Sequence, residues 1–242
     1  MSRLASLTPQ RARTPRSSLS PSPGPPEAIE TTHHRMLRLV ILEVKNTIKT
    51  WDELVLIDGF KAGKGCVDES TEMDNLLQSP DVEERPALST HFVALQEYRE
   101  ALEAVLGKLE KALVKLAMLV DQAEKIFFEA CKLQSMDFAL SEPFWSTWTL
   151  ERFVDSLPPL LSLHNQHYAH LVVLSQSLLS PSTGFDTAKM VLEQWRDLSV
   201  GGQRFLGVRE WEDLVGLELS GGEKDDDDEF ANTGKVKRKG RK

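Results

Sequence analysis

The sequence predicts an all-α protein, an elongated antiparallel helical bundle built around one long central helix with a heptad pattern. Three observations predict this fold class. Apolar residues recur at three- and four-residue steps through most of residues 35–219, and no stretch alternates as a strand would. A heptad pattern runs unbroken from Leu95 to Leu133. The composition, 40% hydrophobic and 27% charged residues, is typical of a globular or helical protein.

Composition also divides the chain into three regions. Residues 1–34 are rich in Ser, Pro and Arg and hold too few apolar side chains to build a core, so we expect a disordered head. Residues 35–219 form the predicted helical bundle. Residues 220–242 are Gly-rich, then acidic, then basic, which predicts a disordered tail.

The first helix is expected at residues 35–57. Its apolar residues share one face of the helix. They are Leu37, Val40, Ile41, Val44, Ile48, Trp51 and Val55. Three glycines that follow, Gly59, Gly63 and Gly65, are expected to end the helix in a flexible loop.

The second helix, expected at residues 87–133, is the longest. Its a and d positions are Leu95, Tyr98, Leu102, Val105, Leu109, Ala112, Leu116, Leu119, Ala123, Ile126, Ala130 and Leu133. The neighbouring position adds Leu106, Leu113, Val120 and Phe127. A seam of this width packs against more than one helix, so the second helix is predicted to be the spine of the bundle.

The chain must turn at Pro143, because a proline cannot continue a helix interior. Thr149 is the expected N-cap of a helix over residues 150–179. Pro158 and Pro159 should kink that helix, or split it into a short leading turn and a longer helix.

Two further helices are expected at the end of the bundle. One covers residues 185–198, with Asp186 as its candidate cap. The other is a shorter amphipathic piece over residues 208–219.

Motifs for catalysis or cofactor binding are weak. Gly59–Gly65 resembles a phosphate-binding loop only faintly, because it follows a helix and lacks a Ser or Thr after its lysine. His164, His167 and His170 step along one helix without a carboxylate or cysteine in the turn to complete a metal site, so we expect them on the polar surface. The expectation is no metal, no cofactor and no enzymatic activity.

Cysteine usage predicts a reducing compartment, and hydropathy predicts a chain without a membrane span. Cys66 and Cys131 are far apart and have no ligand-like companions, which favours free thiols in a reducing environment. No apolar run approaches the roughly 20 residues that a membrane span needs, and the N-terminus does not resemble a signal peptide.

Charge is segregated along the chain, whose net charge is −8. The bundle is acidic and should repel phosphate backbones, so we expect no direct sequence-specific binding to nucleic acid. The end of the tail is basic and has the composition of a nuclear localisation signal. Its residues are Lys235, Lys237, Arg238 and Lys239.

The head carries four proline-directed phosphoacceptor candidates. They are Thr8, Thr14, Ser20 and Ser22. Thr8 fits best the Ser/Thr-Pro-x-Arg/Lys pattern that cyclin-dependent kinases prefer, and phosphate there would offset the positive charge of the head.

Four aromatic residues crowd the segment after Pro143. They are Phe144, Trp145, Trp148 and Phe153. Such a group either closes the end of a bundle or, if left open, anchors a partner. We expect Trp148 and Phe153 to face inward beside Ile126, Phe127 and Ala130, and Trp145 to be the more exposed tryptophan.

The same aromatic segment resembles a signature of the cyclin-dependent kinase 2-interacting protein family. That signature is an aromatic residue followed by x-Thr-Trp and, further along, by Phe. The sequence Phe144-Trp145-Ser146-Thr147-Trp148 with Phe153 carries it. Residues 44–54, with Trp51, resemble the first helix of that family, and Leu192-Glu193-Gln194-Trp195 resembles its last core helix. The three matches occur in the same order, with a long Leu-rich helix between the first two.

The resemblance implies a helical, chromatin-associated nuclear adaptor without enzymatic activity. The partners it implies are cyclin-dependent kinase, the origin-firing kinase and AAA-type ATPase subunits, in DNA replication, S-phase checkpoint signalling or ribosome maturation. Trp51, Trp195 and the aromatic segment would be its interaction or core residues. The heptad pattern leaves an alternative open, a structural coiled-coil subunit of a kinetochore or cytoskeletal complex.

Overall fold

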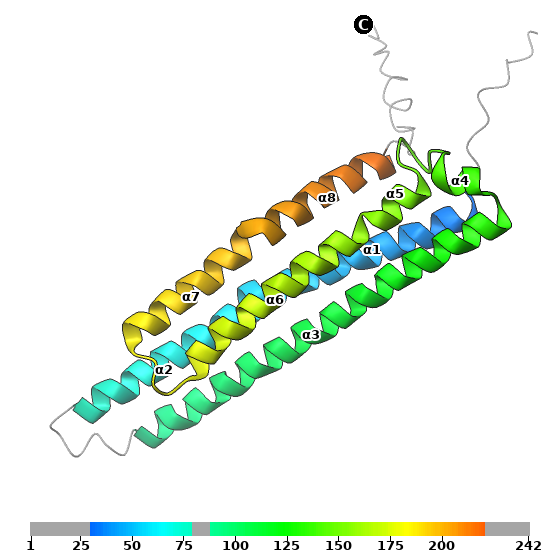
Figure 1. Ribbon diagram of the computed structural model, residues 1–242. Coiled ribbons are helices and arrows are strands. Elements are labelled where there is room, and N and C mark those ends of the chain that lie inside the picture. The colour runs from blue at the N-terminus through cyan, green and yellow to red at the C-terminus, as the bar shows by residue number, and fades with distance from the viewer. Residues whose placement is uncertain (1–29, 79–87, 221–242) are drawn as a thin grey trace, which may run out of the picture. The chain divides into compact units, whose positions relative to one another are not determined.

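The computed structural model describes residues 30–78 and 88–220, which are helical apart from short connections. Its contacts divide the chain after Thr31, and every described helix belongs to the unit that begins at Thr32. Within that unit the helices run up and down along one another as antiparallel rods (Figure 1), which confirms the predicted all-α bundle. The head and tail, apart from a few residues next to the bundle, lie outside the described ranges.

The first rod is a continuous helical stretch and does not end at residue 57. It consists of α1 (Thr32–Glu53), the π-helical turn η1 (Leu54–Gly59) and α2 (Phe60–Gln78). The predicted glycine loop is therefore wrong, and so is any phosphate-binding loop there. The glycines serve close packing instead, because a Cβ at Gly59 would lie 2.6 Å from Trp195 and one at Gly65 would lie 2.4 Å from the Tyr98 ring.

The second rod is α3 (Leu88–Leu133), as its heptad pattern predicted. Most of its a and d residues are buried, and Leu133 at the end of the helix is exposed. α3 packs against the first rod and against α5 and α6, so its wide seam does contact several helices.

A turn region follows α3. The short α4 (Met136–Leu140), which the sequence analysis missed, is capped by Ser135, whose hydroxyl accepts a hydrogen bond from the Phe138 amide. α5 (Leu150–Asp155) is capped by Thr149 as predicted. α6 (Leu157–Leu179) then begins with the two prolines in its first turn, which confirms the predicted split.

The last rod is α7 (Phe185–Val200) followed by α8 (Gly202–Ser220). The predicted cap Asp186 is wrong, because it lies inside the first turn and Gly184 occupies the cap position. α8 begins six residues earlier than expected. Gly201 separates the two helices, and the next residue, Gly202, has a φ of 81° in the left-handed region that favours glycine.

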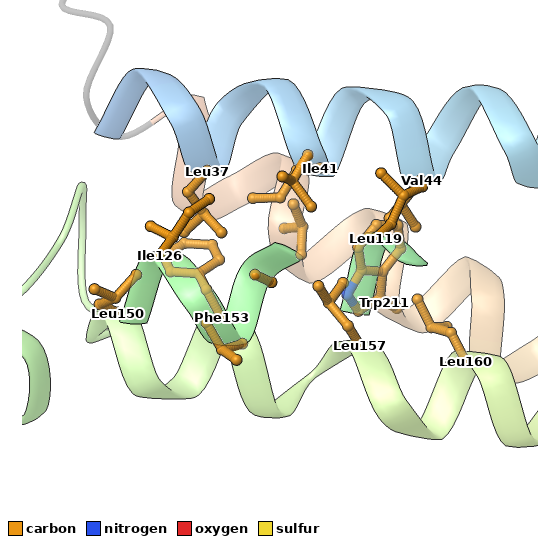
Figure 2. Close-up of a cluster of buried hydrophobic side chains, with 14 of the residues drawn as sticks. Leu37, Ile41, Val44, Leu119, Ile126, Leu150, Phe153, Leu157, Leu160 and Trp211 are labelled. Carbon is orange, nitrogen blue, oxygen red and sulfur yellow. The ribbon is translucent and has the colours of Figure 1, made fainter. Parts of the chain in front are cut away.

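Two hydrophobic clusters fill the bundle. One lies between α1, α5, α6, α8 and the C-terminal half of α3, and Figure 2 shows side chains such as Ile41 of α1 and Leu157 of α6 pointing into it from opposite sides. The other joins the end of α1, η1, α2, α6 and α7 to the N-terminal half of α3, around Trp51 and Trp195. The two tryptophans are fully buried, so each fixes the packing of its neighbours.

Candidate interaction site

The aromatic residues singled out in the sequence lie in two separate places. Phe144, Trp148 and Phe153 are buried in the first hydrophobic cluster, and Trp145 packs against it with partial exposure. Trp51 and Trp195 lie in the second cluster. Trp148 and Phe153 share their cluster with the end of α3, as expected. Five of these six aromatics are thus core residues, and they do not form one surface.

Hydrogen bonds hold the aromatic segment to the end of α8. Glu218 accepts hydrogen bonds from the Thr147 amide (2.7 Å), the Trp148 amide (2.9 Å) and the Thr147 hydroxyl. Burial opposes ionisation of Glu218, but these hydrogen bonds and the charge of Arg152 hold the pKa of its carboxyl below the usual value. Glu218 therefore ties two distant parts of the chain as a carboxylate.

A buried polar cluster lies beneath the junction of α7 and α8. The indole N–H of Trp51 donates to His167 Nδ1 at 3.1 Å, and His164 Nδ1 donates to the Leu160 carbonyl at 2.7 Å. The Trp51 and His164 rings meet edge to face at 5.0 Å between centroids. The predicted surface positions of His164 and His167 are therefore wrong, and of the three histidines only His170 is exposed.

Arg204 in the first turn of α8 completes this cluster. Its Nη2 donates to Asp52 Oδ1 of α1 at 2.5 Å, and only 4% of its side chain is exposed. Its Nε and Nη1 find no hydrogen-bond acceptor among the described residues, and neither does His167 Nε2. A buried cation with a single partner is unusual, because a buried charge is costly unless it is fully paired.

Burial keeps both histidines neutral. Desolvation, together with the charge of Arg204, lowers the pKa of His167 to about 3 and that of His164 to about 4. In neutral His167 the proton lies on Nε2, because Nδ1 accepts from Trp51. Arg204 and His167 consequently both present N–H donors.

A groove lies above this cluster, between α6 and α7. One part, of about 490 Å³, is lined by His170, Val173, Leu174, Gln194, Asp197 and Leu198. A second part, of about 200 Å³, reaches Arg204 and His167 beside Gly201 and Gly202. The two parts share His170 and Leu198, so the groove continues into a second pocket beside Arg204 and His167.

Sequence reasoning missed Arg204 and Asp52, and misplaced the histidines. The spacing of the histidines could have predicted their burial, because His164 and His167 continue the buried stripe of Leu157, Leu160 and Leu171. Nothing in the sequence pairs Asp52 with Arg204 across 152 positions. That pairing follows only from the antiparallel packing of α1 and α8.

Other candidate features have plain outcomes. Cys66 and Cys131 are free thiols, and burial raises the pKa of the Cys66 thiol to about 11. Within residues 30–78 and 88–220 no group of three or more His, Cys, Asp or Glu side chains could hold a metal ion. None of the helices described there is long and apolar enough to cross a membrane. The phosphoacceptor candidates and the basic run lie outside the described residues.

Comparison with known proteins leaves the chain without an assigned family. No protein-family model matches the sequence, and no curated protein matches it.

Proposed function

We propose that this chain is a non-enzymatic nuclear adaptor that links cell-cycle kinases, an AAA-type ATPase assembly, or both, to DNA replication and S-phase checkpoint signalling. The partners are cyclin-dependent kinase, the origin-firing kinase and AAA-type ATPase subunits. The resemblance of the three tryptophan-bearing segments supports this choice of partners. The basic residues 235–239 support nuclear entry.

One observation carries the protein-binding part of the proposal, the groove between α6 and α7. Val173, which is 61% exposed, lines the groove together with Leu174 and Leu198. His170 and Gln194 line it as well. Apolar centres with polar groups around them are typical of surfaces that bind other proteins. A helix of a partner could place one apolar face in such a groove.

The alternative function, a structural coiled-coil subunit, needs a heptad seam that is free to pair with another chain. The seam of α3 faces the interior of the bundle, where Leu102, Leu109 and Ala123 are fully buried. The heptad seam that predicted this alternative is therefore already buried inside the bundle. Its burial supports the adaptor.

A matched pair of substitutions tests the groove. Val173→Glu places a charge on the apolar lining of the groove, and Val114→Glu makes the same change on an exposed face of α3, where the valine is 57% exposed. Direct binding of each purified partner to the full chain is measured by titration. We expect Val173→Glu to weaken binding of a true partner by about 2 kcal/mol or more, and Val114→Glu to leave it unchanged.

Both variants should keep the parental circular dichroism and melting temperature, because both positions are exposed. Failure of all three partner classes to bind the parent chain would overturn the choice of partners. Equal binding of the parent and Val173→Glu would overturn the groove as their docking site.

A further inference from the structure

A second groove lies between α3 and the corner where α5 meets α6. It shares no lining residue with the groove between α6 and α7, and its volume is about 230 Å³. Its apolar lining comes from Phe127 and Phe128 of α3, Val154 of α5 and Pro158 of α6. Phe128 is 58% exposed, so much of its ring is open to an occupant. Exposed aromatic side chains of this kind are typical of binding surfaces.

The remaining residues that line this groove are all acidic. They are Glu124, Glu151 and Asp155, and each of them is exposed. No ion pair or hydrogen bond within residues 30–78 and 88–220 engages any of these three carboxylates. The nearby Arg152 instead lies over the ring of Trp148, at 4.9 Å from its centroid. The apolar lining is therefore surrounded by negative charge without a counter-charge, and we call this surface the acidic groove.

The chemistry of the acidic groove selects a basic occupant. The hydrocarbon stems of Lys and Arg can lie along apolar surface while their charged ends reach carboxylates. A cation over the face of a phenylalanine ring is itself attracted by the ring. A purely apolar segment would leave the carboxylates unpaired, and an acidic segment would be repelled. A segment rich in Lys and Arg fits both the lining and the charge.

The chain itself carries such a segment within reach. Residues 235–242, the basic run, hold six Lys or Arg side chains. The end of α8 and the start of α5 lie at the same end of the bundle (Figure 1), where Glu218 accepts from the Thr147 amide. Four positions separate Thr147 from Glu151 of the acidic groove, a span of about 14 Å at most. Residues 221–234 can cover about 45 Å at roughly 3.3 Å per residue, so the basic run can reach the groove.

The covalent connection also favours this occupant over a free basic segment. A tether that can span the distance gives the basic run an effective concentration on the order of millimolar at the groove. Residues 223–229 are mainly Asp and Glu, and the carboxylates of the groove repel them. The contact is therefore assigned to the basic run alone.

We propose that the basic run, residues 235–242, binds within the same chain to the acidic groove between α3, α5 and Pro158. Its Lys and Arg side chains pair with Glu124, Glu151 and Asp155, and their stems lie on the exposed Phe128 ring. The contact requires none of the partners proposed above. It would also cover the residues that predict nuclear entry.

The test compares two ¹⁵N-labelled forms of the protein by NMR, the full chain and a chain that ends at Gly234. We expect the amide signals of Phe128, Glu151 and Asp155 to differ between the two forms. The amide signal of Glu103, an exposed acid in the N-terminal half of α3, should stay the same. The differences should not depend on protein concentration, and they should disappear near 1 M salt, where the Debye length is about 3 Å.

A synthetic peptide of residues 235–242 serves as a probe of the truncated chain. It should move the same amide signals in a saturable way. A control peptide with Gln at all six basic positions should not move them.

Variants at exposed positions assign the contact to the groove. Glu151→Gln removes a charge of the groove and Phe128→Ala removes the exposed ring, so each should weaken peptide binding by about two- to fivefold. The matched control Glu103→Gln removes an exposed acid elsewhere on α3 and should leave peptide binding unchanged. A melting temperature shared with the parent shows that each variant folds.

Three results would overturn the proposal. Unchanged groove signals after removal of residues 235–242 would show that the basic run does not occupy the groove, even if the free peptide binds there. Differences that grow with protein concentration would place the basic run on a second copy of the chain. Equal weakening by Glu103→Gln and Glu151→Gln would reduce the contact to a diffuse attraction between a basic segment and an acidic bundle. None of these results depends on the outcome of Val173→Glu.

Discussion

At the scale of single residues, hydrogen bonds from buried indole nitrogens fix the positions of three tryptophans. Trp51 donates to His167, Trp195 donates to the Val55 carbonyl at 3.1 Å, and Trp211 donates to the Ser156 hydroxyl at 3.0 Å. A buried indole usually finds such an acceptor, so each of these three tryptophans ties one part of the bundle to another. Sequence spacing could identify the tryptophans as core or interface residues, but it could not choose, because the acceptors come from distant helices.

Replacing Trp148 by Ala tests its place in the core. Trp148 is 6% exposed, and truncating a buried large aromatic costs about 3–5 kcal/mol. We expect Trp148→Ala to lower the free energy of unfolding by that amount in urea denaturation, and Trp145→Ala, at a partly exposed position, to lower it less. A Trp148→Ala protein as stable as the parent would contradict the burial.

At the scale of elements, periodicity predicted the helices and misjudged the breaks between them. α3 and the split between α5 and α6 followed from heptads and prolines, which act locally. The continuity of α1, η1 and α2 did not, because the glycines between them have a long-range cause. Gly59 lies against Trp195, whose indole also bonds the Val55 carbonyl within the π-helical turn. When the packing partner of a glycine is unknown, the glycine predicts the end of a helix.

Two glycine substitutions test that explanation. Gly59→Ala would place a Cβ 2.6 Å from the buried Trp195 ring and should destabilise the protein by about 1–3 kcal/mol. Gly107→Ala in α3 meets no atom within 4 Å and should stabilise it by about 0.5–1 kcal/mol, because alanine favours a helix. The measurement is the free energy of unfolding of both variants. Stabilisation by Gly59→Ala would show that the glycine is not required by packing.

At the scale of the whole molecule, polar groups couple the rods that the hydrophobic clusters hold together. Arg204 joins α8 to α1, and Glu218 joins α8 to the segment before α5. Both contacts link residues far apart in the sequence, and no local pattern of residues predicts such pairs or the groove beside them. The antiparallel bundle itself was predictable, because its helices each carry an apolar face.

The stability of the molecule should therefore fall in mild acid. In the unfolded chain His164 and His167 take up protons near pH 6.5, whereas in the folded chain their pKa values are lowered to about 4 and about 3. Between these values the unfolded state binds more protons, so the free energy of unfolding decreases as the pH falls from 6.5 toward 4, by up to about 1.4 kcal/mol per pH unit for each ring. Urea denaturation from pH 7.5 to pH 5 measures this slope. His167→Gln should reduce it, with His170→Gln at an exposed position as the matched control. Equal slopes for the parent and His167→Gln would show that the buried ring does not titrate as its surroundings require.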